Sequence, residues 1–358
     1  MGAQRVFLHV GSPKTGTTYL QGILWRNRER LWRQGLLLPL DTLGDHYAGS
    51  FEVGGHAPGQ QGPRIRGRSA EGAWQRLVDA SLAWDGDVLI SHEMYQRASA
   101  DQARAAMAPF LAAGREVHVI VTARDLGRQI TAAWQERVKV GGQMTFATYV
   151  ERIEEQPSRH LMGRSFWRAH DTAGIAGRWG GDLPPSQVHV VTVPPSGAPR
   201  DLLWRRFAGV LGIDDAGFDL GTYANESLHL EQVELARRVN VLIDRTPLAG
   251  KHAQSVKRLY ERMLAPRPGT AITLGARERE FARRHAEEIV ARLRKRGVDV
   301  VGSLDDLVPA EDGDDIASAR RPVGTARVVA EAFGSVVDLA GRGVRRLSSG
   351  GRASGGRA

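Results

Sequence analysis

The chain has no cysteine, few lysines, few aromatic residues and no long apolar run. Without cysteine, disulfides, thiolate nucleophiles and Cys-ligated metals are excluded. Aromatic residues make up 6% of the chain and are scattered, so we expect no stacking platform for nucleic acid. No stretch approaches the roughly 18 apolar residues of a membrane span. The apolar run Val6–Val10 is too short for a signal peptide, so we expect a cytoplasmic protein.

The charge is basic, with a formal net charge of +9. Such a balance is compatible with nucleic acid, an anionic membrane or an anionic small ligand. Only five of the 49 basic residues are Lys, and the others are Arg. This lopsided usage favours an arginine-rich solvated surface over selection for one particular partner.

Strands alternate with helices along most of the chain. We predict strands at 5–10, 87–91, 116–122 and 187–193, and helices at 17–34, 71–84, 98–113, 127–140, 200–212, 226–245 and 276–296. A further apolar run occupies 36–40. This alternation predicts parallel βαβ units, and therefore a three-layer α/β/α sandwich around a mainly parallel sheet.

The chain divides by composition into a domain and a tail. We expect one domain over 1–310, with its motifs in a core of about 5–240 and a helical extension over about 241–310. Residues 54–70 are rich in Gly, Pro, Gln and Arg and predict a long loop. Residues 311–358 predict a flexible basic tail, in which the apolar patch 326–340 is a candidate amphipathic helix for an anionic membrane surface.

The sharpest motif is Gly11-Ser12-Pro13-Lys14-Thr15-Gly16-Thr17-Thr18, between the first strand and the first helix. Loop amides and a helix N-terminus at such a junction form a cradle for an anion. Gly11 and Gly16 have the spacing of the nucleotide-hydrolase P-loop, but Thr17 stands where that loop has lysine. The lysine is Lys14, three residues earlier. A kinase would lack its phosphate-neutralising lysine at that position.

This loop resembles the phosphosulfate-binding loop of the sulfotransferases that use 3′-phosphoadenosine-5′-phosphosulfate (PAPS). The family pattern, P-K-[ST]-G-T-T-aromatic-L, is complete here through Tyr19 and Leu20. The resemblance implies a P-loop NTPase-like fold and sulfuryl transfer from PAPS to a hydroxyl or amine without a required metal, with adenosine 3′,5′-bisphosphate as product. It also implies that Lys14 holds the phosphosulfate, that Tyr19 packs near the adenine, and that the 5′-phosphate is bound by Thr15, Gly16, Thr17 and Thr18.

A second motif follows the predicted strand 116–122. The family binds the 3′-phosphate with R-[ND]-x-x-x-R-x-x-S, and the segment Arg124 to Thr131 is similar but one residue shorter, with Thr in place of Ser. The resemblance implies that Arg124 and Thr131 bind the 3′-phosphate. An arginine can bind phosphate oxygens with two parallel hydrogen bonds. Arg128 serves either this site or an ion pair.

Transfer to a hydroxyl or amine requires a group that accepts a proton. His92 follows the predicted strand 87–91, the place in the chain where the family carries its base histidine, and Glu93 is the rival. His46 is a candidate substrate contact or alternative base. His9 and His118 lie inside predicted strands and are expected in the core.

Two other functions stay open. The chain could be a P-loop kinase-like enzyme, which Mg²⁺-dependent ATP turnover would reveal, or a non-catalytic protein that binds PAPS on the same fold. There is no H-E-x-x-H motif, paired aspartate pattern or G-x-S-x-G elbow, so we expect no metal site and no serine hydrolase. The acceptor, whether a small molecule, a glycan or a lipid, carries no signature, and neither does the oligomeric state.

Overall fold

The computed structural model describes residues 4–54, 70–155, 161–221, 228–244, 260, 264, 268–310, 318, 323–324 and 328. The chain folds into two compact units that interleave along the sequence. The first comprises residues 1–129, 153–223 and 281–309, and the second comprises 130–152, 224–280 and 310–358. Most of the expected loop 54–70 and of the expected tail, including nearly all of 326–340, lies outside the described residues.

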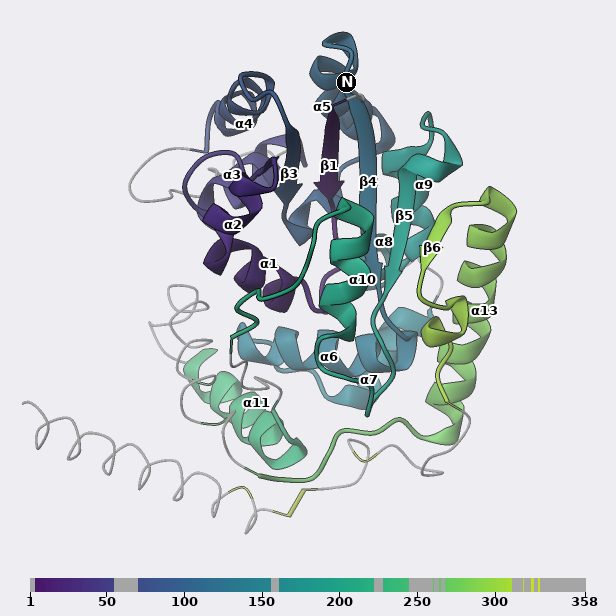
Figure 1. The fold of residues 1–358 in the computed structure, drawn as a ribbon. Coiled ribbons are helices and arrows are strands. Elements are labelled where there is room, and N and C mark those ends of the chain that lie inside the picture. Colours follow the sequence, from purple (N-terminus) through teal and green to yellow (C-terminus); the bar gives the residue numbers. More distant parts are fainter. Residues whose placement is uncertain are drawn as a thin grey trace, which may run out of the picture. The chain divides into compact units, whose positions relative to one another are not determined.

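The first unit is built on a six-stranded sheet (Figure 1). Its strands are β1 (Arg5–His9), β2 (Leu36–Leu37), β3 (Asp87–Ser91), β4 (Glu116–Ala123), β5 (Val188–Thr192) and β6 (Asp299–Val301). They are ordered β2-β3-β1-β4-β5-β6, and each neighbouring pair is parallel. The predicted α/β class with a mainly parallel sheet is confirmed.

Helices connect the strands. The α-helices are α1 (Thr17–Arg26), α2 (Arg28–Arg33), α3 (Leu43–Val53), α4 (Ala73–Leu82), α5 (Ala100–Ala112), α6 (Leu126–Lys139), α7 (Phe146–Glu154), α8 (Leu161–His170), α9 (Thr172–Gly180), α10 (Leu202–Leu211), α11 (Leu230–Asp244) and α13 (Ala276–Arg296). Three short 3₁₀ helices are η1 (Glu93–Arg97), η2 (Pro185–Gln187) and η3 (Leu304–Leu307).

The alternation of side chains along each strand produces the two outer layers. Val6 and Leu8 belong to a core that also contains apolar residues of α4, α5, α9 and α13. Phe7, between them, belongs to a second core with residues of α1, α2 and α10. Successive strand residues point to opposite faces. The sheet is therefore buried on both sides, as a parallel sheet requires, and Figure 1 shows α1 and α10 on one of its faces.

The predicted helix 17–34 is interrupted at Asn27. Its side-chain amide donates to the carbonyl oxygens of Ile23 at 2.8 Å and Asp219 at 2.9 Å, and its Oδ1 accepts from the Asp219 N–H at 2.8 Å. An asparagine that bonds nearby backbone in this way competes with the helical ladder. Asn27 consequently separates α1 from α2.

The region expected as a helical extension over 241–310 also contributes to the sheet. β6 pairs with β5, His189 lying opposite Asp299, and α13 buries Ile289 and Leu293 in the first core. A strand of three residues has too few side chains for an alternating pattern, which is why the sequence did not predict it. Helices α7, α8 and α9 were likewise not predicted.

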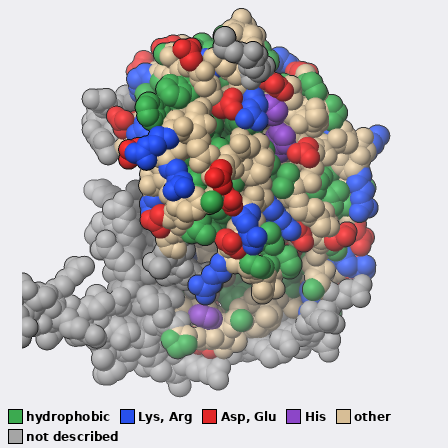
Figure 2. Space-filling model, viewed as in Figure 1, with side chains coloured by type: hydrophobic (Ala, Val, Ile, Leu, Met, Phe, Trp, Pro, Cys, Tyr) green, Lys and Arg blue, Asp and Glu red, His purple; other side chains and the backbone are tan. Residues whose placement is uncertain are grey.

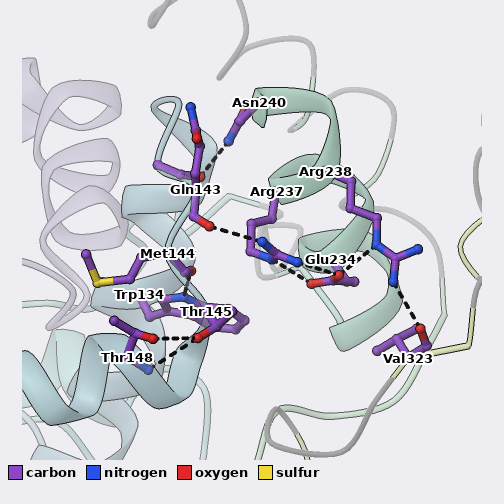
Figure 3. A network of polar contacts seen from close by, with 11 residues as sticks. Trp134, Gln143, Met144, Thr145, Thr148, Glu234, Arg237, Arg238, Asn240 and Val323 are labelled. Carbon is purple, nitrogen blue, oxygen red and sulfur yellow. Dashed lines mark hydrogen bonds and ion pairs between the residues drawn. The ribbon is translucent and has the colours of Figure 1, made fainter. Parts of the chain in front are cut away.

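The second unit contains a network of polar contacts centred on α11 (Figure 3). Glu234 accepts from Arg237 Nε at 2.8 Å and from Arg238 Nε at 2.7 Å. The same two arginines reach other segments, because Arg237 donates to the Gln143 carbonyl at 3.1 Å and Arg238 to the Val323 carbonyl at 3.2 Å. The Glu234 carboxylate thereby orients two arginines, each of which binds the backbone of a different segment.

Acidic side chains accompany many of the surface arginines. Figure 2 shows basic and acidic side chains interspersed over the described part of one face. Among the ion pairs, Arg5 meets Asp87 at 2.5 Å and Arg206 meets Asp306 at 2.7 Å. Within the described residues, no helix combines the length and the apolar character needed to cross a membrane.

Candidate active site

The strand order reverses beside β1, at the point where sites form in open parallel sheets. The chain passes from β1 to β2 and β3 on one side and then crosses to β4 on the other. Ligands of such sheets bind outside the carboxyl ends of the strands at this switch point. The loop after β1 and the segment after β4, which carry the two sequence motifs, lie at this edge.

The loop between β1 and α1 has a left-handed backbone at three residues. The φ angles are +74° at Gly11, +64° at Lys14 and +80° at Gly16. This conformation costs a residue with a Cβ roughly 1–2 kcal/mol, so Lys14 stores strain. Gly16 is the N-cap of α1 and has no side chain with which to cap the helix amides. A strained lysine beside an uncapped helix N-terminus suits an anion.

Hydrogen bonds connect this loop to Thr122 near the end of β4. The Ser12 N–H donates to the Thr122 carbonyl at 3.2 Å. The Thr15 hydroxyl lies 2.5 Å from the Ser12 carbonyl oxygen and 2.6 Å from Thr122 Oγ1. Thr15 is fully buried, Thr17 is buried and Thr18 is exposed. Because the Thr15 hydroxyl is used inside the loop, we expect Thr15 to contact an anion through its backbone N–H.

Three residues that the sequence analysis missed support the loop from the other side. Gln129 donates to Ser12 Oγ at 3.0 Å, and that hydroxyl donates to the Ala169 carbonyl at 2.8 Å. His170 is buried beside them, and burial, reinforced by the Lys14 charge, lowers its pKa to about 3. No motif spacing connects these residues with the loop, so only the fold could reveal them.

Arg124 reaches from the end of β4 to the loop. Its Nη1 donates to the Lys14 carbonyl oxygen at 3.2 Å. Its Nε is buried and has no hydrogen-bond partner among the described residues. Burial, together with the neighbouring charge of Arg128, lowers the pKa of Arg124 to about 10, which leaves it protonated at neutral pH. A buried cation with an unused donor is costly unless an anion completes it.

Asp125 and Arg128 have structural roles. Asp125 Oδ1 accepts from the Arg128 N–H at 3.1 Å, which caps α6 at its first turn. The Arg128 side chain lies 3.5 Å from Asp125 Oδ2 and donates to the Pro194 carbonyl at 3.2 Å. Of the two roles expected for Arg128, these contacts favour the ion pair.

Tyr19 and Thr131 were also expected to contact the donor. Tyr19 lies on α1, and its hydroxyl donates to the Arg200 carbonyl at 3.2 Å. Thr131 lies on α6 within the second unit. The expected contacts of Tyr19 with an adenine and of Thr131 with a phosphate stay predictions.

His92 and Glu93 follow β3 at the same edge of the sheet. His92 Nδ1 accepts from the Met94 N–H at 3.2 Å and lies 3.8 Å from Glu93 Oε2. The His92 ring packs on Tyr47, with 4.9 Å between ring centroids. Burial lowers the pKa of His92 although Glu93 opposes this effect. Gln21 on α1 donates to Glu93 Oε2 at 3.1 Å.

Glu93 also packs against the start of the loop. A Cβ at Gly11 would lie 2.6 Å from Glu93 Cβ and 2.7 Å from Glu93 Cα. Only glycine permits this approach, since its φ is also positive. The fold therefore brings together the loop, Arg124 and the His92–Glu93 pair, which are far apart in the sequence.

His46 does not fit the role expected for it. It is fully buried, its Nε2 lies 2.8 Å from the Pro39 carbonyl oxygen, and its Nδ1 accepts from the Ser91 N–H at 3.0 Å. Burial lowers its pKa to about 4. Both ring nitrogens are thus occupied by backbone, which leaves neither for an acceptor, and we assign His46 to the support of the strand end.

Of the two histidines expected in the core, His9 is buried and His118 is partly buried, and both contact other polar side chains. His9 is fully buried and its Nδ1 lies 2.8 Å from Ser91 Oγ. His118 stacks on His189, and His118 Nδ1 lies 2.8 Å from His189 Nε2. Among the described residues, no group of three or more His, Asp and Glu side chains is arranged to hold a metal ion, and the expected independence of metal stays a prediction.

Comparisons with known proteins add a distant likeness. No family model and no curated protein matches the chain. Among solved structures, the chain is similar to one described as a sulfotransferase from Alicyclobacillus acidocaldarius, with a TM-score of 0.41 and 18% sequence identity. The match covers 70% of this chain and 100% of that one. A likeness this distant carries no argument about the chemistry of the site.

Proposed function

We propose that the protein transfers a sulfuryl group from PAPS to a hydroxyl or amine acceptor. The observation that carries this proposal is the contact between Arg124 and the Lys14 carbonyl oxygen, 3.2 Å long. It joins two segments, 110 residues apart in the chain, that the sequence motifs predict to bind anions. A donor with two separate anionic groups, a 5′-phosphosulfate and a 3′-phosphate, suits two such segments side by side.

The residues present fit this donor. The uncapped amides of α1 and the Lys14 ammonium are suited to the phosphosulfate. The Arg124 Nε, which is buried without a partner among the described residues, is suited to a phosphate oxygen. When bound, PAPS supplies the sulfuryl group and a leaving phosphate. Thr15, Gly16, Thr17 and Thr18 line the loop, and we propose that their backbone amides bind the 5′-phosphate.

We assign the role of base to Glu93. The Met94 N–H occupies the lone pair of His92 Nδ1, so a neutral His92 carries its proton on Nε2. That nitrogen is then a donor and cannot take a proton from the acceptor. The pKa of Glu93 lies below its ordinary value, so Glu93 is a carboxylate at neutral pH. Glu93 is thus already in the form that can accept the proton of the acceptor.

The other polar groups have electrostatic roles. In the proposed reaction, the acceptor oxygen or nitrogen bonds to sulfur as the bond between sulfur and the leaving phosphate oxygen breaks, and the acceptor proton passes to Glu93. Lys14 offsets the charge that develops on the leaving oxygen, which is the largest kind of catalytic contribution in such sites. His92, held between Tyr47 and Glu93, donates its Nε2–H to the acceptor.

The acceptor side of the site includes α3. Tyr47 contacts both His92 and Phe51, and both aromatic side chains are partly exposed. We propose that these two rings contact the carbon skeleton of a small-molecule, glycan or lipid acceptor. We also propose that the reaction takes place in the cytoplasm.

The proposal is tested with ³⁵S-labelled PAPS. The purified protein is incubated with a panel of hydroxyl and amine acceptors, with and without EDTA, and labelled product and adenosine 3′,5′-bisphosphate are quantified. We expect equal amounts of both products with at least one acceptor, and the same rate with EDTA. Turnover of ATP that requires Mg²⁺, without any turnover of PAPS, would overturn the proposal in favour of a kinase-like enzyme.

A further inference from the structure

Gln21 is a buried polar residue that no motif singled out. It lies on α1, one turn beyond the anion-binding loop, and is 3% exposed. Its Nε2 donates to Glu93 Oε2 at 3.1 Å, between elements 72 residues apart in sequence. A buried amide remains in a protein interior at low cost only when it is hydrogen-bonded. The contact with Glu93 therefore accounts for the presence of Gln21.

Glu93 is confined from three directions. Its Cα and Cβ pack against Gly11, because a Cβ at that position would lie 2.7 Å from Glu93 Cα and 2.6 Å from Glu93 Cβ. Its Oε2 lies 3.8 Å from His92 Nδ1 and accepts from Gln21. Two of these three neighbours, Gly11 and Gln21, flank the loop that binds the donor in the proposed function. The carboxylate and the donor loop are thus held by the same segment.

We propose that Gln21 is a positioning residue, whose amide keeps the Glu93 carboxylate ionised and directed at the reacting atoms beside the donor loop. That Glu93 faces reacting atoms rests on the proposed function, but the link between Gln21 and Glu93 can be tested without activity. Gln21 itself touches neither donor nor acceptor in this proposal. It acts through Glu93 alone.

The charges around Glu93 agree with this role. Burial raises the pKa of Glu93, whereas His92, its own backbone N–H, Gln21 and His9 lower it, and the lowering prevails. His92 lies on the same segment and His9 on β1, and burial lowers the pKa of both, that of His9 to about 4. The Gln21 donor is therefore one of the interactions that hold the pKa of this desolvated carboxylate below its ordinary value.

Two substitutions separate positioning from simple packing. Gln21→Met keeps the length of the side chain and removes the donor. Gln21→Glu keeps the shape and replaces the donor with a second carboxylate, which opposes ionisation of Glu93. Asn27→Ala is the matched control, because Asn27 is also a buried amide at the end of α1 but bonds only to backbone of Ile23 and Asp219.

The direct measurement is a ¹³C-carboxyl NMR titration of Glu93, with the resonance assigned by its loss in Glu93→Gln. We expect the midpoint to rise by about one pH unit in Gln21→Met, the tenfold change typical of a lost hydrogen bond to a charge. A larger rise is expected in Gln21→Glu. The acidic limb of the kcat profile should move by the same amount, while the affinity for adenosine 3′,5′-bisphosphate stays within about twofold.

The outcomes are separable. An unchanged Glu93 midpoint in both Gln21 variants would overturn the inference, even if the enzyme is active. An equal rise in Asn27→Ala would also overturn it, because a general loss of packing would then explain the effect. If the wild type turns over no PAPS, the proposed function fails, and the NMR titration alone still decides whether Gln21 controls the ionisation of Glu93.

Discussion

The two edges of the first unit's sheet place the same kinds of side chain in opposite circumstances. At the amino-terminal edge, Arg115 is buried and donates to the carbonyl oxygens of Gly86, Trp84 and Leu82. At the carboxyl-terminal edge, Arg124 makes one contact with the loop, and its Nε has no partner among the described residues. Arg115 is hydrogen-bonded within the protein, whereas Arg124 keeps an unused donor that, in the proposed function, binds an anion.

The acidic residues at the two edges lie in different surroundings. At the amino-terminal edge, Glu116 lies 3.1 Å from His118, and Asp299 lies 2.7 Å from His189. These groups have side-chain partners that stabilise the fold. At the other edge, Glu93 is held beside a strained loop. At the edge where the strand order reverses, the strained Lys14 backbone lies in the loop beside Glu93, and the Arg124 Nε has no partner among the described residues.

Replacement of the proposed base should have the largest effect. Glu93→Gln removes the proton acceptor and should lower kcat by about 10²–10⁴-fold, the usual contribution of a general base. The matched change at the opposite edge, Glu116→Gln, should leave kcat within about twofold. Both are measured with ³⁵S-labelled PAPS and the acceptor found in the panel. Equal rates for Glu93→Gln and the wild type would remove Glu93 from the mechanism.

Gly11 and Gly114, at opposite edges of the sheet, have the same φ of +74° but different surroundings. A Cβ at Gly114 meets nothing within 4 Å, whereas a Cβ at Gly11 would lie 2.6 Å from Glu93. Gly114→Ala should cost only the left-handed strain, roughly 1–2 kcal/mol of unfolding free energy. Gly11→Ala should cost about 3 kcal/mol, because overpacking adds to that strain, and should also weaken bisphosphate binding. Urea unfolding measures the difference, and equal losses would contradict the close packing of Glu93 on the loop.

The buried histidines of the site predict a smaller, pH-dependent effect. The pKa of His46 falls from 6.5 to about 4 on folding. The unfolded chain therefore binds more protons between these values, and stability is lost as pH falls from 6.5 towards 4. The contribution of His46 by pH 4.5 is about 2 kcal/mol. His46→Gln should reduce the difference in unfolding free energy between pH 7 and pH 4.5, measured by urea unfolding. The variant should also be less stable than the wild type at pH 7. A slope equal to that of the wild type would contradict the burial of a neutral ring.

The sequence predicted the sheet because strands and helices leave local patterns, and the two segments expected to bind anions also rest on local motifs. The predicted α13 range, 276–296, matches the helix, and β1, β3 and β4 appear within one residue of their predicted bounds. The position of Lys14 in the loop and of Arg124 after β4 follows directly from chain order.

Other parts depend on contacts that leave no local signal. Gln21 and Glu93 meet only because α1 and η1 lie side by side, and no spacing in the sequence shows this. His46 looked like a substrate contact because a polar residue after an apolar run is ambiguous, and its two backbone partners appear only in the fold. His92 occupies the expected place after β3, and its Nδ1 accepts from the Met94 N–H, a local contact at the start of η1.

Calorimetric titration with adenosine 3′,5′-bisphosphate tests the central claim most directly, with Arg124→Ala and Arg115→Ala as the paired variants. We predict micromolar binding by the wild type that is indifferent to Mg²⁺. Arg124→Ala should bind about 100-fold more weakly, the loss expected for charge-assisted hydrogen bonds to phosphate, while Arg115→Ala lowers the melting temperature and keeps the affinity. Absence of bisphosphate binding in the wild type, together with Mg²⁺-dependent binding of ATP, would contradict the account.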